Sequence, residues 1–259
     1  MKIRSERLRA ATLAAVIHLA ISALIAAVAA IVVLGVWFPY PYRILSGGMH
    51  LFLLMIGIDV ICGPLLTLII FNPKKSKKEL FIDLGLIGLL QCIALLYGMH
   101  SIAMARPVAL VFEVDRFVSV TAAQIRQAGE DKQTSEYNKL SWTGPRLLSA
   151  RSAANGEEAI KSIELSLHGI GPSARTEMWQ SYENNKKNII LRKKNISSLL
   201  EKIAIEEKNN LLLLIDKLKL NINDVFYLPM VSEKELDSWI VLLDGDANII
   251  GYAPLDGFL

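Results

Sequence analysis

The chain has 259 residues, of which 53% are hydrophobic and 20% are charged, and its mean hydropathy is +0.38. This composition is too apolar for an ordinary soluble protein and too charged for one that lies wholly within a membrane. Residues 1–104 carry nine Lys and Arg against four Asp and Glu, whereas residues 105–259 carry nineteen against twenty-one. The basic excess therefore belongs to the apolar half, which indicates membrane flanks and excludes a nucleic-acid surface.

Three apolar runs predict three transmembrane helices in the first half of the chain. They cover about residues 11–38, 47–71 and 80–105, and each is long enough to cross a bilayer. The first run follows a basic segment and contains Ala27-Val28-Ala29, which imitates a signal-peptide cleavage site. Because the run is too long for the apolar region of a signal peptide and continues to Trp37, we expect a retained span.

The second and third runs each carry a polar side chain near the middle. Asp59 lies at that depth in the second run and is followed by Pro64, which removes a helical hydrogen bond. A buried carboxylate costs on the order of 3 kcal/mol on insertion scales, so such a residue usually faces protein. Gln91 in the third run can hydrogen-bond between helices. Asp59 therefore either makes a structural bond between the spans or recognises another transmembrane helix.

The distribution of basic residues predicts how the chain is oriented. Four Lys and Arg precede the first run, only Arg43 lies between the first and second, and four lysines lie in the turn 72–79, beside which Asp83 can act as an interfacial cap. Basic segments remain in the cytoplasm. We therefore expect a cytoplasmic N-terminus and a C-terminal part on the outer side, which is the periplasm for a bacterial inner membrane.

Residues 106–259 predict a periplasmic α+β domain that is large enough for its own core. Alternating apolar residues predict a first strand near 108–114, and Asp244-Gly245 between two short apolar runs predicts a hairpin. Residues 130–154 read as irregular. The remaining expected elements are helices at about 122–128, 157–168 (capped by Asn155), 173–182 and 195–218, and strands at 225–230, 239–243 and 248–252. The fold class is thus three transmembrane helices over 1–105 followed by an α+β domain over 106–259.

The sequence lacks a recognisable catalytic or metal-binding pattern. It has no nucleophile elbow, phosphate loop or dinucleotide motif, and its histidines fall on separate elements without metal-site spacing: His18, His50, His100 and His168. A calcium loop is the alternative at Asp244 and Asp246, but the later ligands and the closing Glu are missing. We therefore expect no enzyme, no cofactor and no metal site.

Several of these residues form motifs that resemble a known family. The motifs are Asp59…Gly63-Pro64-Leu65-Leu66-Thr67, Asp83, Gln91, Tyr97-Gly98, Ala105-Arg106-Pro107-Val108, Phe112…Asp115-Arg116-Phe117 and Trp142-Thr143-Gly144-Pro145. With them the chain resembles the TfpX/TfpZ family of type IV pilin accessory proteins, some members of which are called FimB. The resemblance is best over about residues 40–120 and extends to the layout of three spans and a periplasmic domain.

The resemblance implies an inner-membrane protein, not an enzyme, that assists a cognate major pilin in stability or assembly. Pilins have one apolar helix with a buried acid and a mature N-terminal amine, and a periplasmic head. We expect Asp59, Pro64 and Gln91 to contact the pilin helix within the lipid bilayer. We expect the periplasmic domain to hold the pilin head, with an interaction or structural motif formed by Arg106, Asp115, Arg116 and Trp142.

The alternative function is a membrane-anchored periplasmic sensor or ligand-binding subunit. The expected cytoplasmic segments, residues 1–9 and 72–79, are too short for an output domain. An intramembrane enzyme or transporter component lacks the residues that it would need. The sequence therefore favours the pilin accessory protein, with its oligomeric state left open.

Overall fold

A computed structural model describes residues 2–129, 137 and 139–259. The chain divides into two compact units, one formed by Met1–Trp37 and Gly47–Met104 and the other by Phe38–Ser46 and Ala105–Leu259. The sequence places a single boundary after residue 105. The structure differs in one respect, because the short connection between the first two long helices belongs to the second unit.

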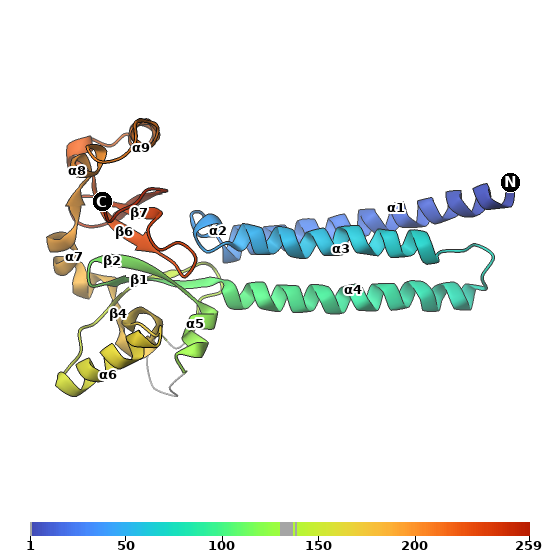
Figure 1. Ribbon diagram of the computed structural model, residues 1–259, viewed down its shortest axis with the longest axis horizontal. Helices are drawn as coiled ribbons and strands as arrows, with labels where there is room; N and C mark the ends of the chain where they lie inside the picture. The colour runs from blue at the N-terminus through green and yellow to red at the C-terminus, as the bar shows by residue number, and fades with distance from the viewer. Residues whose placement is uncertain (1, 130–136, 138) are drawn as a thin grey trace. The chain divides into compact units, whose positions relative to one another are not determined.

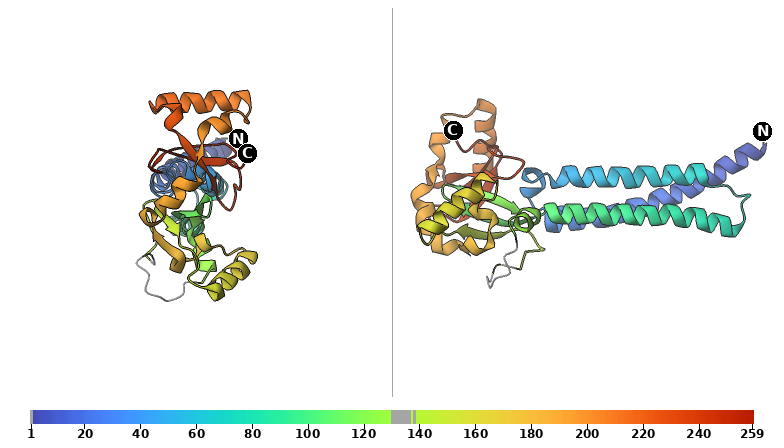
Figure 2. Two further views of the ribbon diagram at one scale, coloured as in Figure 1. Left: turned by 90° about the vertical axis from the view of Figure 1, so that its left-hand side faces the viewer. Right: turned by 60° about the horizontal axis from the view of Figure 1, so that its bottom comes forward.

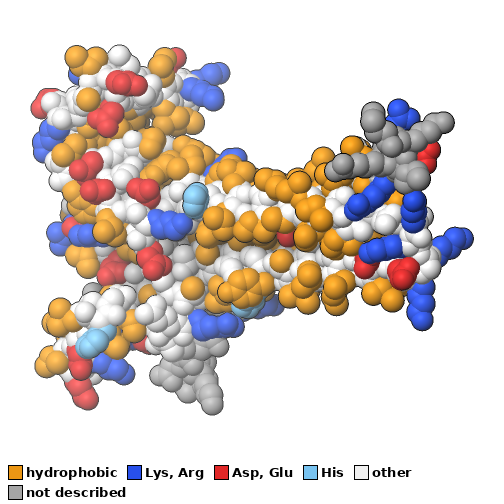
Figure 3. Space-filling model, turned by 45° about the vertical axis from the view of Figure 1, so that its right-hand side comes forward, with side chains coloured by type: hydrophobic (Ala, Val, Ile, Leu, Met, Phe, Trp, Pro, Cys, Tyr) orange, Lys and Arg blue, Asp and Glu red, His pale blue; other side chains and the backbone are white. Residues whose placement is uncertain are grey.

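Three long helices run side by side in the first unit (Figures 1 and 2). They are α1 (Lys2–Ala30), which continues as the π-helical η1 (Ile31–Trp37), α3 (Gly48–Ile70) and α4 (Lys77–Ala105). All three are long and apolar enough to cross a membrane, and hydrophobic side chains cover much of their surface in Figure 3. The three expected spans are thus confirmed as helices of the right length and composition.

Charged side chains tie the helices together at the end that carries the lysine turn. Arg7 of α1 donates through Nη2 to the carbonyl oxygen of Ile69 at 3.1 Å. Lys75 in the turn pairs with Asp83 of α4, with 2.5 Å between Nζ and Oδ2. Figure 3 shows Lys and Arg side chains gathered at this end. The pairing of Asp83 with the lysine turn agrees with its expected interfacial role.

In its described residues, the second unit is built on one sheet of eight strands. Its strand order is β4-β3-β1-β2-β6-β7-β8, with β5 paired to β6. The pairs β1–β3 and β2–β6 are parallel and the others are antiparallel. The strands are β1 (Pro107–Glu113), β2 (Arg116–Thr121), β3 (Arg146–Ala150), β4 (Trp179–Ser181), β5 (Lys194–Asn195), β6 (Phe226–Val231), β7 (Trp239–Leu243) and β8 (Ile249–Ala253).

Short helices flank this sheet, which gives the expected α+β class (Figure 1). Two of them begin where the sequence predicts, because Thr121 and Gln124 form a capping box and Asn155 accepts a hydrogen bond from the Glu158 amide. The helices are α2 (Tyr42–Leu45), α5 (Ala122–Gln127), α6 (Gly156–Leu167), α7 (Lys186–Arg192), α8 (Ile196–Leu200) and α9 (Ile205–Lys217), with 3-10 turns at Pro172–Ala174, Thr176–Met178, Tyr182–Asn185 and Ile222–Asp224.

The core lies on both faces of the strands β6, β7 and β8. Alternate side chains such as Tyr227 and Leu242 pack under α8 and α9 on one face. Their neighbours Leu228 and Val241 pack on the opposite face, with side chains of β1 and β2. Strands buried on both faces read as continuous apolar runs, which is the pattern of β7.

The connection over residues 38–46 supplies part of the second core. Leu45 is fully buried and Tyr42 nearly so, and the Tyr42 ring lies 6.2 Å from the Tyr252 ring, edge to face. Ser232 donates a hydrogen bond of 2.8 Å to the carbonyl oxygen of Leu45. The connection between the first two long helices is therefore an integral part of the C-terminal fold.

Four expectations for the second unit need correction. The sequence predicts that residues 130–154 are irregular; residues 130–136 and 138 of this stretch lie outside the described residues, but its later part contains strand β3, which pairs with β1. The polar residues Arg146 and Ser149 hide the apolar pattern of this strand. The stretch 173–182 forms 3-10 turns and strand β4 and not a helix, and 195–218 is broken into β5, α8 and α9. The sequence predicts that Pro229 stops the strand at 225–230, but Pro229 lies inside β6, which continues to Val231. The expected hairpin is confirmed, because β7 pairs antiparallel with β8.

Candidate functional site

A network of hydrogen bonds joins the three long helices. His18 of α1 lies 2.6 Å from the hydroxyl of Thr67 through Nδ1 and 2.5 Å from Oε1 of Gln91 through Nε2. Gln91 of α4 then donates through Nε2 to the main-chain oxygen of Asp59 at 3.0 Å. Thr67 and Asp59 both lie on α3. The polar side chains that interrupt the apolar runs thus satisfy one another between helices, where water cannot do so.

The hydrogen-bond partners in this network determine which of its atoms carry protons. The Asp59 carbonyl can only accept, so the Gln91 amide must point its nitrogen toward it and its oxygen toward His18. That oxygen also only accepts, so His18 carries a proton on Nε2. For the neutral imidazole, Nδ1 then accepts from the Thr67 hydroxyl. Each polar atom of the network then has one role, and these bonds help to fix the rotation of α1, α3 and α4 relative to one another.

Two glycines allow α3 and α4 to approach closely. A Cβ atom on Gly63 would lie 2.0 Å from Nε2 of Gln91, and one on Gly98 would lie 2.6 Å from Cγ of Met55. Neither distance is compatible with a real side chain. Gly63 therefore provides the space in which Gln91 reaches α3, while Pro64 beside it lies inside a helix that continues to Ile70.

A groove lies beside this network. Its volume is about 210 Å³, much larger than the roughly 10–15 Å³ of such space that a cavity needs to hold one water molecule. One wall comes from α1, the other from α4, and α3 contributes two residues between them. The lining residues are His18, Ile21, Ser22, Ile25, Ala26, Ile56, Asp59, Gly88, Gln91, Cys92 and Leu95.

Asp59 is the charged side chain of the groove. It is half-buried, and among the described residues its carboxylate has no hydrogen-bond or ionic partner. A carboxylate in an apolar setting is stabilised by a hydrogen-bond donor or a cation. The groove therefore presents an acceptor that is open to a donor from outside the chain.

Small residues line both walls of the groove at helical spacing. Ser22 and Ala26 are four positions apart on α1, and Gly88 and Cys92 are four apart on α4. A Cβ atom on Gly88 would meet no atom within 4 Å. Small residues four apart allow another helix to approach closely within a membrane. The shape and chemistry of the groove suit an apolar helix that carries a polar or cationic group.

The structure brings the expected intramembrane residues together but not as a side-chain pair. Gln91 contacts the main chain of Asp59, and the Asp59 carboxylate faces the groove instead. Sequence reasoning missed His18 and Thr67 as members of the network. Both interrupt apolar runs, and that signal marks them as polar but does not indicate which helices they join.

The four residues expected to form a motif in the C-terminal domain form two separate pairs. Arg106 is buried before β1, donates to the Ser141 carbonyl at 3.2 Å and stacks on Trp142 with 3.8 Å between the guanidinium carbon and the ring centre. Asp115, in the turn after β1, pairs with Arg116 at the start of β2, with 2.8 Å between Oδ1 and Nε. The pairs lie at opposite ends of β1. Arg116 also stacks on the ring of Phe258, with 4.8 Å between the guanidinium carbon and the ring centre.

The turn between β7 and β8 satisfies Asp244 internally. Its Oδ1 accepts from the amides of Asp246 and Asn248, and its Oδ2 accepts from the Asn248 side chain. Through these bonds the Asp244 side chain stabilises the hairpin turn. In the part of the chain that the structure describes, no three His, Cys, Asp or Glu side chains lie close enough to hold a metal ion.

In comparisons with known proteins, the family model and the relatives that match this chain are all described as fimbrial assembly proteins. The family model described as fimbrial assembly protein FimB matches residues 6–47. Two fimbrial assembly proteins of Dichelobacter nodosus, of serogroups I and E1, are each 34% identical over 242 residues, which cover 93% of this chain and 94% of the relative. A third, of serogroups C1 and C2, is 50% identical over 99 residues, 38% of this chain and 76% of the relative. No solved structure matches the chain.

Proposed function

Because the chain belongs to the FimB family of fimbrial assembly proteins, we propose that it acts in type IV pilus assembly as an accessory protein that binds the major pilin in the membrane. The observation that carries this proposal is the groove between α1 and α4, in which Asp59 has no partner among the described residues. An apolar helix with a cationic or hydrogen-bonding group is the ligand that this groove suits. A pilin helix, with its mature amine and its buried acid, has that character.

The physical basis is the cost of unpaired polar groups in hydrocarbon. A carboxylate at the centre of a bilayer costs about 3 kcal/mol on insertion scales, and an unpaired donor on the incoming helix carries a cost of its own. Contact between Asp59 and the pilin amine removes both costs. The hydrogen-bonded chain through His18 and Gln91 holds the groove walls in place before the pilin arrives.

The proposed setting is the bacterial inner membrane, with the N-terminus in the cytoplasm and the C-terminal domain in the periplasm. The lysine turn and the basic N-terminal segment support this orientation. The pilin head would then lie on the same side as the C-terminal domain. Assistance of this kind requires binding and positioning, and it needs no catalytic group, cofactor or nucleic acid.

Removing the charge of Asp59 tests the proposal in cells. Asp59→Asn keeps the size of the side chain and replaces the carboxylate with an amide, so it should lower surface piliation or the level of pilin by several-fold. The variant itself should remain in the membrane at the normal level, because the Gln91 bond goes to the main chain of Asp59. Normal piliation with Asp59→Asn would leave the carboxylate with only a structural role.

A further inference from the structure

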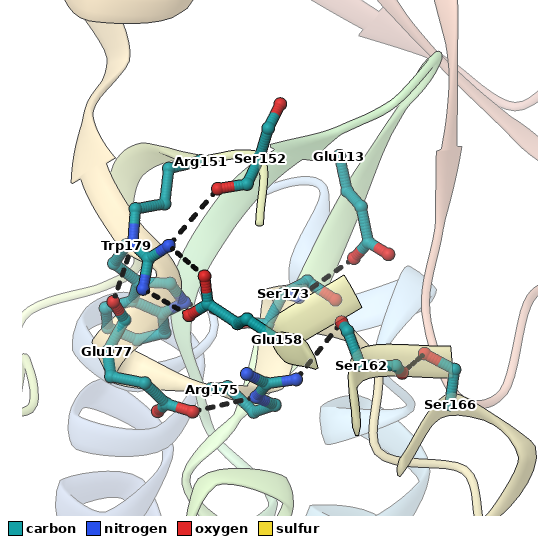
Figure 4. Close-up of polar contacts among 10 residues, drawn as sticks. All are labelled: Glu113, Arg151, Ser152, Glu158, Ser162, Ser166, Ser173, Arg175, Glu177 and Trp179. Carbon is teal, nitrogen blue, oxygen red and sulfur yellow. Dashed lines mark hydrogen bonds and ion pairs between the residues drawn. The ribbon is translucent and has the colours of Figure 1, made fainter. Parts of the chain in front are cut away.

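Helix α6 is attached to the C-terminal domain by polar contacts. Arg151, which follows β3, donates two hydrogen bonds to the Glu158 carboxylate, of 2.7 Å and 2.9 Å. Arg175 is almost fully buried and donates to the Ser162 hydroxyl at 3.1 Å. Figure 4 shows both arginines directed toward α6 from the body of the domain. Glu158 and Ser162 are four residues apart, so they define the inner face of the helix.

Three of the large apolar side chains of α6 point the other way, whereas Leu165 is partly buried on the inner face. Ile160, Ile163 and Leu167 are 70%, 63% and 83% exposed, and no residue of α6 is buried. Their spacing of three and four places them on one stripe of the helix. An amphipathic helix on a domain surface normally turns this stripe to the core. In α6 the face with Glu158, Ser162 and Leu165 is turned inward, and the stripe of Ile160, Ile163 and Leu167 is turned outward. An exposed apolar stripe of this kind is the arrangement of a contact surface.

Acidic side chains border the apolar stripe along one edge. Glu157 and Glu164 are both exposed and seven residues apart, so they lie on the same side of Ile160 and Ile163. Lys161 is also exposed and lies one step further from the stripe on that side. The opposite edge has Ala159 and Ser166 and carries no charge. The stripe therefore has an acidic border, in the position that flanking charges occupy beside a helix–helix seam.

We propose that the outer face of α6, formed by Ile160, Ile163 and Leu167 with Glu157 and Glu164, binds an amphipathic helix of a partner protein that carries Lys or Arg along one edge. The apolar stripe supplies the contact area, and the two carboxylates select the basic edge of the partner. This surface is separate from the membrane groove, and it does not depend on the pilin helix being the ligand there.

The charge pattern disfavours two other occupants of this face. An anionic bilayer surface would be repelled by the acidic border. In a two-fold antiparallel pairing of α6 with a second copy, the acidic edge of one helix would face the acidic edge of the other, and like charges at such positions are unfavourable. A partner helix with a basic edge would be attracted to the acidic border and would avoid both repulsive contacts.

Two synthetic helical peptides serve as probes for this surface. One contains leucine and lysine in an amphipathic pattern, and the other contains leucine and glutamate in the same positions. Their binding to the full chain in nanodiscs of uncharged lipid is followed by fluorescence anisotropy, with empty nanodiscs subtracted. We expect the lysine peptide to bind at least ~10-fold more tightly than the glutamate peptide, because charge complementarity favours it.

Variants of the chain locate the binding. Ile163→Ser with Leu167→Ser should abolish binding of the lysine peptide, and Glu157→Lys with Glu164→Lys should reverse the preference between peptides. Leu191→Ser with Ile205→Ser is the matched control, because both side chains are 80% exposed elsewhere on the domain, and it should have no effect. These side chains are on the surface, so the melting temperature should be unchanged in each variant.

Several outcomes would overturn the proposal. Binding that is insensitive to the Ile163 and Leu167 changes places the peptide elsewhere. Equal binding of both peptides removes the role of the acidic border. If the peptide binds only to the lipid of the nanodisc, the observed affinity is a membrane effect. If no peptide binds but the chain self-associates, and the Ile163 and Leu167 changes abolish that self-association, the face binds a second copy of the chain.

Discussion

Single residues decide how the three long helices meet. Gln91 joins α4 to both α1 and α3, because its oxygen accepts from His18 and its nitrogen donates to the main chain of Asp59. Gly63 leaves the space that the Gln91 side chain occupies. The residues that form this network come from three helices, yet each contributes only one or two atoms. Small changes at these positions should therefore have large effects.

Gly63→Ala is the sharpest test at this scale. The new Cβ atom would lie 2.0 Å from Nε2 of Gln91, so Gln91 must leave its position and the hydrogen bonds on both sides of it are lost. We expect the free energy of unfolding in detergent micelles to fall by about 1–3 kcal/mol, the cost of leaving polar groups unpaired.

Gly57→Ala is the matched control for that measurement. It lies on the same helix, and a Cβ atom there would meet nothing within 4 Å. Because Ala favours the helix over Gly by up to about 1 kcal/mol, this change should be neutral or stabilising. Equal effects of the two substitutions would contradict the close approach at Gly63.

The sequence predicts which residues matter in the spans better than it predicts their partners. Asp59 and Gln91 stand out because they are polar within apolar runs, and His18 and Thr67 carry the same signal. Which of them touch depends on the rotation of each helix about its axis. That rotation is fixed by all contacts together, including those at Gly63 and Gly98, so spacing within one helix does not reveal it.

At the scale of secondary-structure elements, helix α6 is held in place by an ion pair and hydrogen bonds. The Arg151 guanidinium and the Ala154 amide both bond to the Glu158 carboxylate and hold its pKa down at about 2, compared with 4.5 for an ordinary glutamate. A carboxyl group whose pKa is lowered in the folded state stabilises that state above its unfolded pKa. Its contribution is lost as the pH falls toward the folded value.

We therefore expect acid to loosen α6 before it unfolds the sheet. As the pH falls from about 4.5 to 2, the protection of Gly156–Leu167 against amide hydrogen exchange, relative to the intrinsic rate at each pH, should fall, while that of β7 remains high. Glu158→Gln cannot form the ion pair, so its α6 should exchange quickly at neutral pH and should not respond in this range. Exchange in α6 that is equally slow in both proteins would contradict the role of the Arg151–Glu158 pair.

Helix caps and turn motifs in the sequence predict the elements of the C-terminal domain that they begin or join. Elements without such motifs are not detected from the sequence. The capping box at Thr121, the Asn155 cap and the Asp-Gly turn at Asp244 each locate an element correctly. Strand β4 has only three residues, and its place in the sheet depends on pairing with β3. The break between α8 and α9 is hidden because apolar residues continue on one stripe across it. Pairing and packing between distant segments decide such cases.

At the scale of the whole molecule, the chain crosses between its two units three times. It leaves the first unit after Trp37, returns at Gly47 and enters the second unit finally after Met104. Composition shows the change from apolar to charged sequence near residue 105 but gives no sign that nine residues between two spans belong to the later domain. Their aromatic and proline content suits a membrane interface equally well.

The C-terminal domain should therefore depend on the connection at 38–46. Leu45 is fully buried in its core, so Leu45→Ala should lower the free energy of unfolding of the domain by about 2–5 kcal/mol. The loss should be visible as faster hydrogen exchange in β7, nearly two hundred residues away in the sequence. Ile44→Ala is the control, because Ile44 is 57% exposed, and it should change stability by less than about 0.5 kcal/mol.

The central proposal is that the groove between α1 and α4 holds the helix of the major pilin, and in-cell photocrosslinking tests it most directly. A photoreactive amino acid at Ile56, which lines the groove, should form an adduct with pilin, and the same group at Leu54, which is 59% exposed on another side of α3, should not. Gly88→Leu fills the groove and should remove the adduct, whereas Gly57→Leu should leave it. Failure to recover a pilin adduct at Ile56, or an adduct that persists unchanged with Gly88→Leu, would contradict the account.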